Sequence, residues 1–150
     1  MYLESSTIGW MLTRVVLVAG VSALAGCAMD GAPEPAPPSG DVVSFSGEIQ
    51  PIFDANCTTC HRDGGLAALA GIAMRLTADE AYDSLVGRPS SQDASLTLVE
   101  PGDAEASLLF RKVSSDSPPV GRRMPLFSGP LSASEVGLIR DWIDQGAEDN

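Results

Sequence analysis

Two cysteines and the chain's one histidine fall within five consecutive positions, and this cluster constrains the fold more than any other feature. The residues are Cys57, Cys60 and His61. Residues spaced i, i+3 and i+4 share one face of a helix, so both sulfurs and the imidazole can address a single ligand. Apolar residues at helical spacing precede the cluster, and we therefore expect a helix over residues 46–60.

The pattern Cys-x-x-Cys-His is the attachment signature of a c-type haem. In that chemistry Cys57 and Cys60 form thioethers with the haem vinyl groups, and His61 then lies under the iron. Two other interpretations stay open from the residues alone. The cysteine pair could serve an exported protein as a disulfide or redox dithiol. A zinc site is disfavoured because the sequence has no second Cys/His pair.

A second axial ligand would have to be a methionine, because the sequence has no other histidine. Met29 lies in a proline-rich stretch, and the apolar neighbours of Met74 indicate packing. Met124 lies directly before Pro125 between two predicted helices, and a residue before proline favours an extended backbone. We therefore predict Met124 as the distal ligand, with plain core filling as the alternative.

Residues 1–26 have the features of a bacterial signal peptide. Arg14 precedes an apolar run, and the run ends in Leu-Ala-Gly-Cys, which resembles the lipobox of bacterial lipoproteins. We predict cleavage before Cys27 and a lipid on that cysteine. An ordinary signal peptide or a short membrane anchor is the alternative.

The signal is more compact if translation starts at Met11, because the acidic Glu4 suits the basic start of a signal peptide poorly. Residues 27–43 are rich in proline and small residues, which predicts an extended tether between the lipid and a folded domain. A lipid on Cys27 would hold the protein on the periplasmic side of a bacterial membrane. Ala28, in place of aspartate, favours the outer membrane by resemblance to known lipoprotein sorting.

Residues 44–150 are predicted to form one all-α domain of about four short helices and long loops. Two Ser/Thr-x-x-Glu patterns indicate capping boxes at helix starts, and glycines mark helix ends. Residues 96–99 are predicted to be extended. After the first helix, the expected helices are 81–86, preceded by the box Thr77/Glu80, a third that Asp103 caps, and 132–146, opened by the box Ser132/Glu135.

From Phe45 to Ala147 the chain resembles a class I cytochrome c domain of the small exported bacterial kind. The motifs that carry this resemblance are Ile49-Gln50-Pro51-Ile52-Phe53, the Cys57–His61 site, Pro101-Gly102-Asp103, Ser107-Leu108-Leu109, Arg123-Met124-Pro125 and Leu138–Ala147.

The resemblance implies a monohaem electron carrier in which Cys57 and Cys60 hold haem c, His61 is the proximal ligand and Met124 the distal one. It also implies that the first and last helices cross, with Trp142 against Phe53 or the haem edge. The main alternative is a haem sensor or peroxidase-like site whose sixth position is open or labile. Further alternatives are an accessory domain that delivers electrons to a separate enzyme and a haem-free dithiol protein.

The formal net charge of −11, from 20 acidic and 9 basic residues, argues against nucleic-acid binding and favours redox partners with a basic docking patch. Arg122 and Arg123 flank the predicted ligand Met124 and are candidates for pairing with the haem propionates. The alternative for these two arginines is a pair of solvated surface charges. The long segment 88–101 departs from the simplest members of the family, and its role is open.

Overall fold

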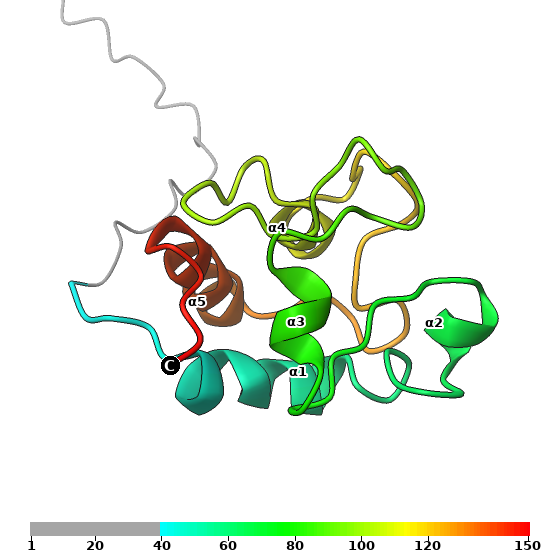
Figure 1. Ribbon diagram of the computed structural model, residues 1–150, viewed down its shortest axis with the longest axis horizontal. Coiled ribbons are helices and arrows are strands. Elements are labelled where there is room, and N and C mark those ends of the chain that lie inside the picture. Colours follow the sequence, from blue (N-terminus) through cyan, green and yellow to red (C-terminus); the bar gives the residue numbers. More distant parts are fainter. Residues whose placement is uncertain (1–39) are drawn as a thin grey trace, which may run out of the picture. The chain divides into compact units, whose positions relative to one another are not determined.

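The computed structural model describes residues 40–150. The predicted signal peptide 1–26, the start at Met11, the lipid site Cys27 and all but the end of the tether lie outside these residues. Within them, every regular element is helical, which confirms the all-α prediction (Figure 1). The elements are η1 (Phe45–Ile49), α1 (Gln50–Asn56), α2 (Leu66–Leu69), α3 (Ala81–Leu85), α4 (Leu108–Ser114) and α5 (Ala133–Asp144).

The first predicted helix is present but ends earlier than expected. It opens as one π-helical stretch, η1, whose N-terminus is capped by the Ser44 hydroxyl accepting from the Gly47 amide at 3.1 Å. Proline 51 fits in the first turn of α1, where its missing N–H costs nothing. The helix stops at Asn56 because Cys57 leaves the helical region, with φ −124°. The Cys–His cluster is therefore a turn beyond the helix.

The last helix, α5, follows its sequence signals closely. The predicted capping box is present, since the Ser132 hydroxyl accepts from the Glu135 amide and the Glu135 carboxylate accepts from the Ser132 amide. Its buried face presents Ile139, Trp142 and Ile143 to the core, and Figure 1 shows α5 beside the start of the first helix. The crossing of the first and last helices is thus present, as η1 packs on α5.

Trp142 packs on a different aromatic residue from the one expected. Its ring centroid lies 5.2 Å from that of Phe45, and Phe45 in turn contacts Phe53 at 6.3 Å. The indole N–H donates to the carbonyl of Glu148 at 3.0 Å, so the polar tip of this buried side chain is satisfied. The aromatic cluster closes the core at this end of the molecule.

Two predicted helix caps are wrong in detail. The Thr77 hydroxyl contacts the Glu80 carboxylate at 3.2 Å but caps no amide, and α3 begins only after Glu80. Asp103 accepts from the Ala106 amide and so caps a short turn, whereas α4 begins after Ser107. Ser107 has an extended backbone (ψ 123°), and its buried hydroxyl donates to the Asp103 carbonyl at 2.8 Å, which separates the turn from the helix.

Segment 88–101 is tied to α4 by its own backbone. Its extended part pairs with the residues after α3, through the Leu98 amide donating to Arg88 at 2.7 Å and the Gly87 amide donating to Val99 at 2.9 Å. The Thr97 and Leu98 carbonyls accept from the first amides of α4. These bonds satisfy donors that a helix start leaves unpaired. No helix of residues 40–150 is long and apolar enough to span a membrane.

Candidate ligand-binding site

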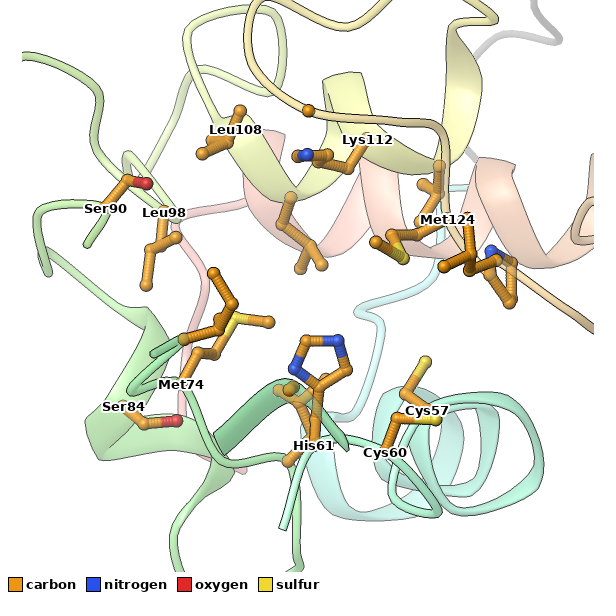
Figure 2. A pocket seen from close by; sticks show the side chains of 18 of the residues that line it. Cys57, Cys60, His61, Met74, Ser84, Ser90, Leu98, Leu108, Lys112 and Met124 are labelled. Atoms are coloured by element: carbon orange, nitrogen blue, oxygen red, sulfur yellow. The ribbon is translucent and has the colours of Figure 1, made fainter. Parts of the chain in front are cut away.

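A cavity of about 1020 Å³ lies beyond the end of α1, at the upper end of the range for small-molecule sites (Figure 2). The Cys–His turn, the segment before α3, segment 88–92, α4 and the loop 121–128 all contribute to its wall. Much of the wall is apolar, from side chains that include Ala55, Ala67, Ile72, Leu76, Leu98, Leu108, Leu109, Val113, Leu126 and Phe127. The site is therefore suited to a large, mainly apolar ligand.

Cys57, Cys60 and His61 all line this cavity, as the sequence pattern predicted (Figure 2). The His61 amide donates to the Cys57 carbonyl at 3.0 Å, so one turn of helix-like geometry persists here although α1 has ended. Both thiols are free. Burial raises the pKa of the Cys57 thiol to about 12, and the negative charge of Glu135 and then Cys60 add to the effect. A thiol protonated at neutral pH differs from the activated thiolate of redox dithiols.

His61 is held as a neutral imidazole. Burial of the ring lowers its pKa below the ordinary value, and the positive charge of Lys112 lowers it further, while the backbone of Met74 acts in the opposite direction. Nδ1 is buried and forms no hydrogen bond, and Figure 2 shows the ring projecting into the cavity. A neutral imidazole aimed into an apolar cavity is the form that binds a metal.

Two methionines, Met74 and Met124, line the same cavity. Both are half-buried and pack against the hydrophobic core, so geometry gives each of them the packing role that the sequence suggested for Met74. Figure 2 shows them reaching the cavity from different sides, Met74 from the strand-like segment before α3 and Met124 from the loop after α4. The Met124 amide donates to the Lys112 carbonyl at 2.7 Å, which anchors that loop to α4. Met124 as distal ligand stays a prediction.

The two arginines beside Met124 have different surroundings. Arg122 is exposed and lines the cavity. Arg123 forms an ion pair with Asp116 at 2.5 Å, does not line this cavity, and keeps a buried Nε without a hydrogen bond. Of the two predicted propionate contacts, Arg122 is therefore the one that the fold places at the cavity.

Lys112 is a site residue that the sequence reasoning missed. It lies on α4 with only 8% of its surface exposed and lines the cavity. The available signal was the spacing of Lys112, which follows Leu108 by four positions and so shares the face of the helix that carries this apolar residue. Burial lowers the pKa of this ammonium group.

A zinc-type site receives no support from the described residues. Across residues 40–150, no three side chains of His, Cys, Asp or Glu converge as metal ligands. The possible ligand groups at the cavity are instead the thiols of Cys57 and Cys60, the imidazole of His61 and the thioethers of Met74 and Met124.

Comparison with known proteins gives one distant relative. The chain is 31% identical over 124 aligned positions to hydrazine synthase subunit alpha of Kuenenia stuttgartiensis, an alignment that covers 71% of this chain. The chain spans only 15% of the length of that subunit. No protein-family model matches the chain, and no solved structure matches it.

Proposed function

We propose that this protein is a monohaem c-type cytochrome, with a class I cytochrome c-like domain, that carries single electrons. Haem c would be attached through thioethers to Cys57 and Cys60, with His61 and Met124 as axial ligands. The observation that carries this proposal is that these four side chains, 67 positions apart at their extremes, line one cavity with apolar walls.

The residues fit a covalently bound haem. The cavity has room for a large planar ligand, and both cysteines are free to form thioethers. When bound, haem c supplies a one-electron Fe(III)/Fe(II) couple at the position that the imidazole and the thioether address. A bound haem would also cover the apolar side chains that line the cavity.

Each ligand residue has a definable role. Burial keeps the His61 imidazole neutral and therefore able to donate its lone pair. As a ligand, the soft thioether of Met124 would favour the reduced metal, and its loop is anchored to α4 by the hydrogen bond from the Met124 amide to the Lys112 carbonyl. An imidazole and a thioether reach the cavity from two different segments and could together fill both axial positions of an iron, which is why we propose electron transfer rather than enzymatic turnover.

The proposal does not extend to hydrazine synthesis. Because the chain corresponds to a small part of the hydrazine synthase subunit, we propose that the two share one domain and that the activity of the whole subunit is not carried over. The strongly acidic composition supports a redox partner with a basic docking patch. The lipid on Cys27, the periplasmic location and the outer membrane remain proposals from the sequence.

The test is the visible spectrum of the full chain expressed in a periplasm with the c-haem maturation machinery. We expect covalent haem, a weak far-red band from a methionine–Fe(III) bond, and no response of the reduced protein to carbon monoxide. The Met124→Ala variant should lose the far-red band, whereas the matched control Met74→Ala should keep it. The double variant Cys57→Ser/Cys60→Ser should carry no covalent haem.

Three outcomes would contradict parts of the proposal. A carbon monoxide adduct of the wild type would indicate an open or labile sixth position and favour a sensor or peroxidase-like function. Loss of the far-red band in Met74→Ala but not in Met124→Ala would reassign the distal ligand. Absence of haem in the wild type would leave a haem-free dithiol protein.

A further inference from the structure

Lys112 is a buried cation without an anionic partner in the described part of the chain. Its Nζ donates to the carbonyl of Arg122 at 3.3 Å, and no carboxylate of residues 40–150 forms an ion pair with it. This is notable in a chain with 20 acidic residues. A buried charge is tolerated best when it is paired and hydrogen-bonded, so this ammonium group is suited to pair with an anion that enters the cavity.

A second donor converges on the same place. A Cβ built on Gly121 would lie 2.7 Å from Nζ of Lys112 and 3.2 Å from Nε2 of Gln92, so both side chains approach this glycine. Gly121 has φ +66° and bears no side chain that would separate them. Ser90, which is buried, accepts from the Gln92 amide at 3.1 Å, and this bond fixes the local turn that carries Gln92.

This polar region lies at the end of the cavity away from the cysteines. In Figure 2, Ser90 and Lys112 stand on one side of the cavity and Cys57 and Cys60 on the other. Two further cations, Arg88 and Arg122, line the cavity, against the single carboxylate of Asp83 on its described wall. The cavity therefore has a thiol end and a basic, donor-rich end.

A haem carries its vinyl groups and its two propionate carboxylates on opposite edges. If the vinyl edge is attached to the cysteines, the carboxylates point toward the other end of the cavity. We infer that Lys112, assisted by Gln92 from segment 88–101, binds a haem propionate and is the buried counter-charge of the site. This inference rests on the proposed function, and it gives segment 88–101 the role of supplying one side of the propionate site.

The inference replaces the expectation that Arg122 and Arg123 provide this contact. Arg123 is already paired with Asp116, and the exposed Arg122 would meet a carboxylate in water, where an ion pair contributes little. Lys112 is desolvated, and a hydrogen bond to a charged group is stronger when water is excluded.

The experiment compares Lys112→Met with the matched control Arg111→Met in the matured holoprotein. Arg111 is the preceding residue of α4, carries the same charge and does not line the cavity. We expect the propionate bending bands in the resonance Raman spectrum to shift in Lys112→Met and to stay unchanged in Arg111→Met. Gln92→Ala, at an exposed position where folding is not at risk, should give a smaller shift of the same bands.

A second measurement changes the ligand instead of the protein. Full chain produced without the maturation machinery is titrated with ferric haem and with haem dimethyl ester, which lacks free carboxylates. We expect Lys112→Met to weaken haem binding by about tenfold or more and to leave ester binding unchanged.

The outcomes separate this inference from the proposed function. Haem-containing protein whose Raman bands are the same in Lys112→Met and wild type would overturn the inference and leave the cytochrome assignment intact. Equal weakening of haem and ester binding would also overturn it, because the lysine would then act on packing. A wild type that neither binds haem nor attaches it covalently would overturn both.

Discussion

Two regions of the molecule differ in how they are stabilised. One is the helical layer formed by η1, α1 and α5. The other is the cavity side, formed by the segments that line the cavity. In the helical layer, aromatic rings contact one another and the helix starts are capped by Ser44 and Ser132. The cavity side consists of α2, α4 and several loops, and it holds two of the three buried polar atoms without hydrogen bonds among the described residues, Nδ1 of His61 and Nε of Arg123. The third is Oε1 of Gln50, in α1.

This difference indicates which region stabilises the fold and which depends on a ligand. The helical layer buries its own apolar side chains, among them Phe45, Phe53 and Trp142. The cavity side gathers apolar walls, an imidazole and the buried Lys112 around one cavity, so we expect a bound ligand to add to its stability. The predictions below test this division in the chain without haem, unless stated otherwise.

The largest effect is expected from truncating the aromatic core of the helical layer. Phe53 is 1% exposed, and Phe53→Ala should lower the free energy of unfolding by about 3–5 kcal/mol, measured by denaturant titration. Leu98→Ala, which changes a half-buried side chain on the cavity wall, should cost less than about 2 kcal/mol because a half-buried side chain loses fewer packing contacts. Equal losses would mean that the cavity side stabilises the fold as strongly as the helical layer.

The next effect concerns two glycines, one from each region. A Cβ on the buried Gly65 would collide with the backbone carbonyl of Cys60, so Gly65→Ala should destabilise the chain by about 1–3 kcal/mol and distort the Cys–His turn. The control is Gly137→Ala in α5, where a Cβ meets open space and should stabilise the helix by about 0.5–1 kcal/mol. In matured protein, Gly65→Ala should also lower the yield of covalent haem, and an unchanged yield would contradict the turn's role.

A smaller effect is expected at the cap of α5. Ser132→Ala should lower the free energy of unfolding by about 1 kcal/mol because it removes the hydroxyl of the capping box. Ser134→Ala, at an exposed position two residues further along, should change it little. The hydrogen bonds from Ser132 lower the pKa of Glu135. Their contribution is therefore complete above the ordinary glutamate pKa and is lost as the pH falls through the lowered folded value.

The difference in stability between wild type and Ser132→Ala should accordingly shrink on acidification below pH 5. Denaturant titrations at a series of pH values measure it. If this difference in unfolding free energy stays constant at the lowest pH at which the protein remains folded, the cap acts through the Ser132 hydroxyl alone.

The smallest effect is expected on the exposed apolar surface of the cavity side. Leu69 in α2 is 77% exposed, so Leu69→Ser should change the free energy of unfolding by less than about 0.5 kcal/mol. The comparison is Leu131→Ser, whose side chain is 7% exposed and should cost several times more. A loss above about 1 kcal/mol for Leu69→Ser would indicate that α2 contributes to the fold more than its exposure suggests.

The positions of the longer helices and the grouping of Cys57, Cys60 and His61 could be predicted from local patterns. The end of α1 at Asn56 and the start of α4 at Leu108 could not be predicted in this way. They depend on backbone torsions at Cys57 and Ser107 that no spacing rule specifies. The capping box at Ser132 formed where the one at Thr77 did not, although both have the same sequence pattern. The partner of Trp142 also depended on how η1 and α5 cross.

The sequence by itself determined that the described domain is helical and that Cys57, Cys60 and His61 address one site, because periodicity and i, i+3, i+4 spacing act over a single turn. Only the tertiary structure decided that Met74, Met124 and Lys112 share that cavity and that Arg123 does not line it. Burial and pairing of a charge depend on residues far apart in the chain, and these come together only when the loops fold over the helical layer.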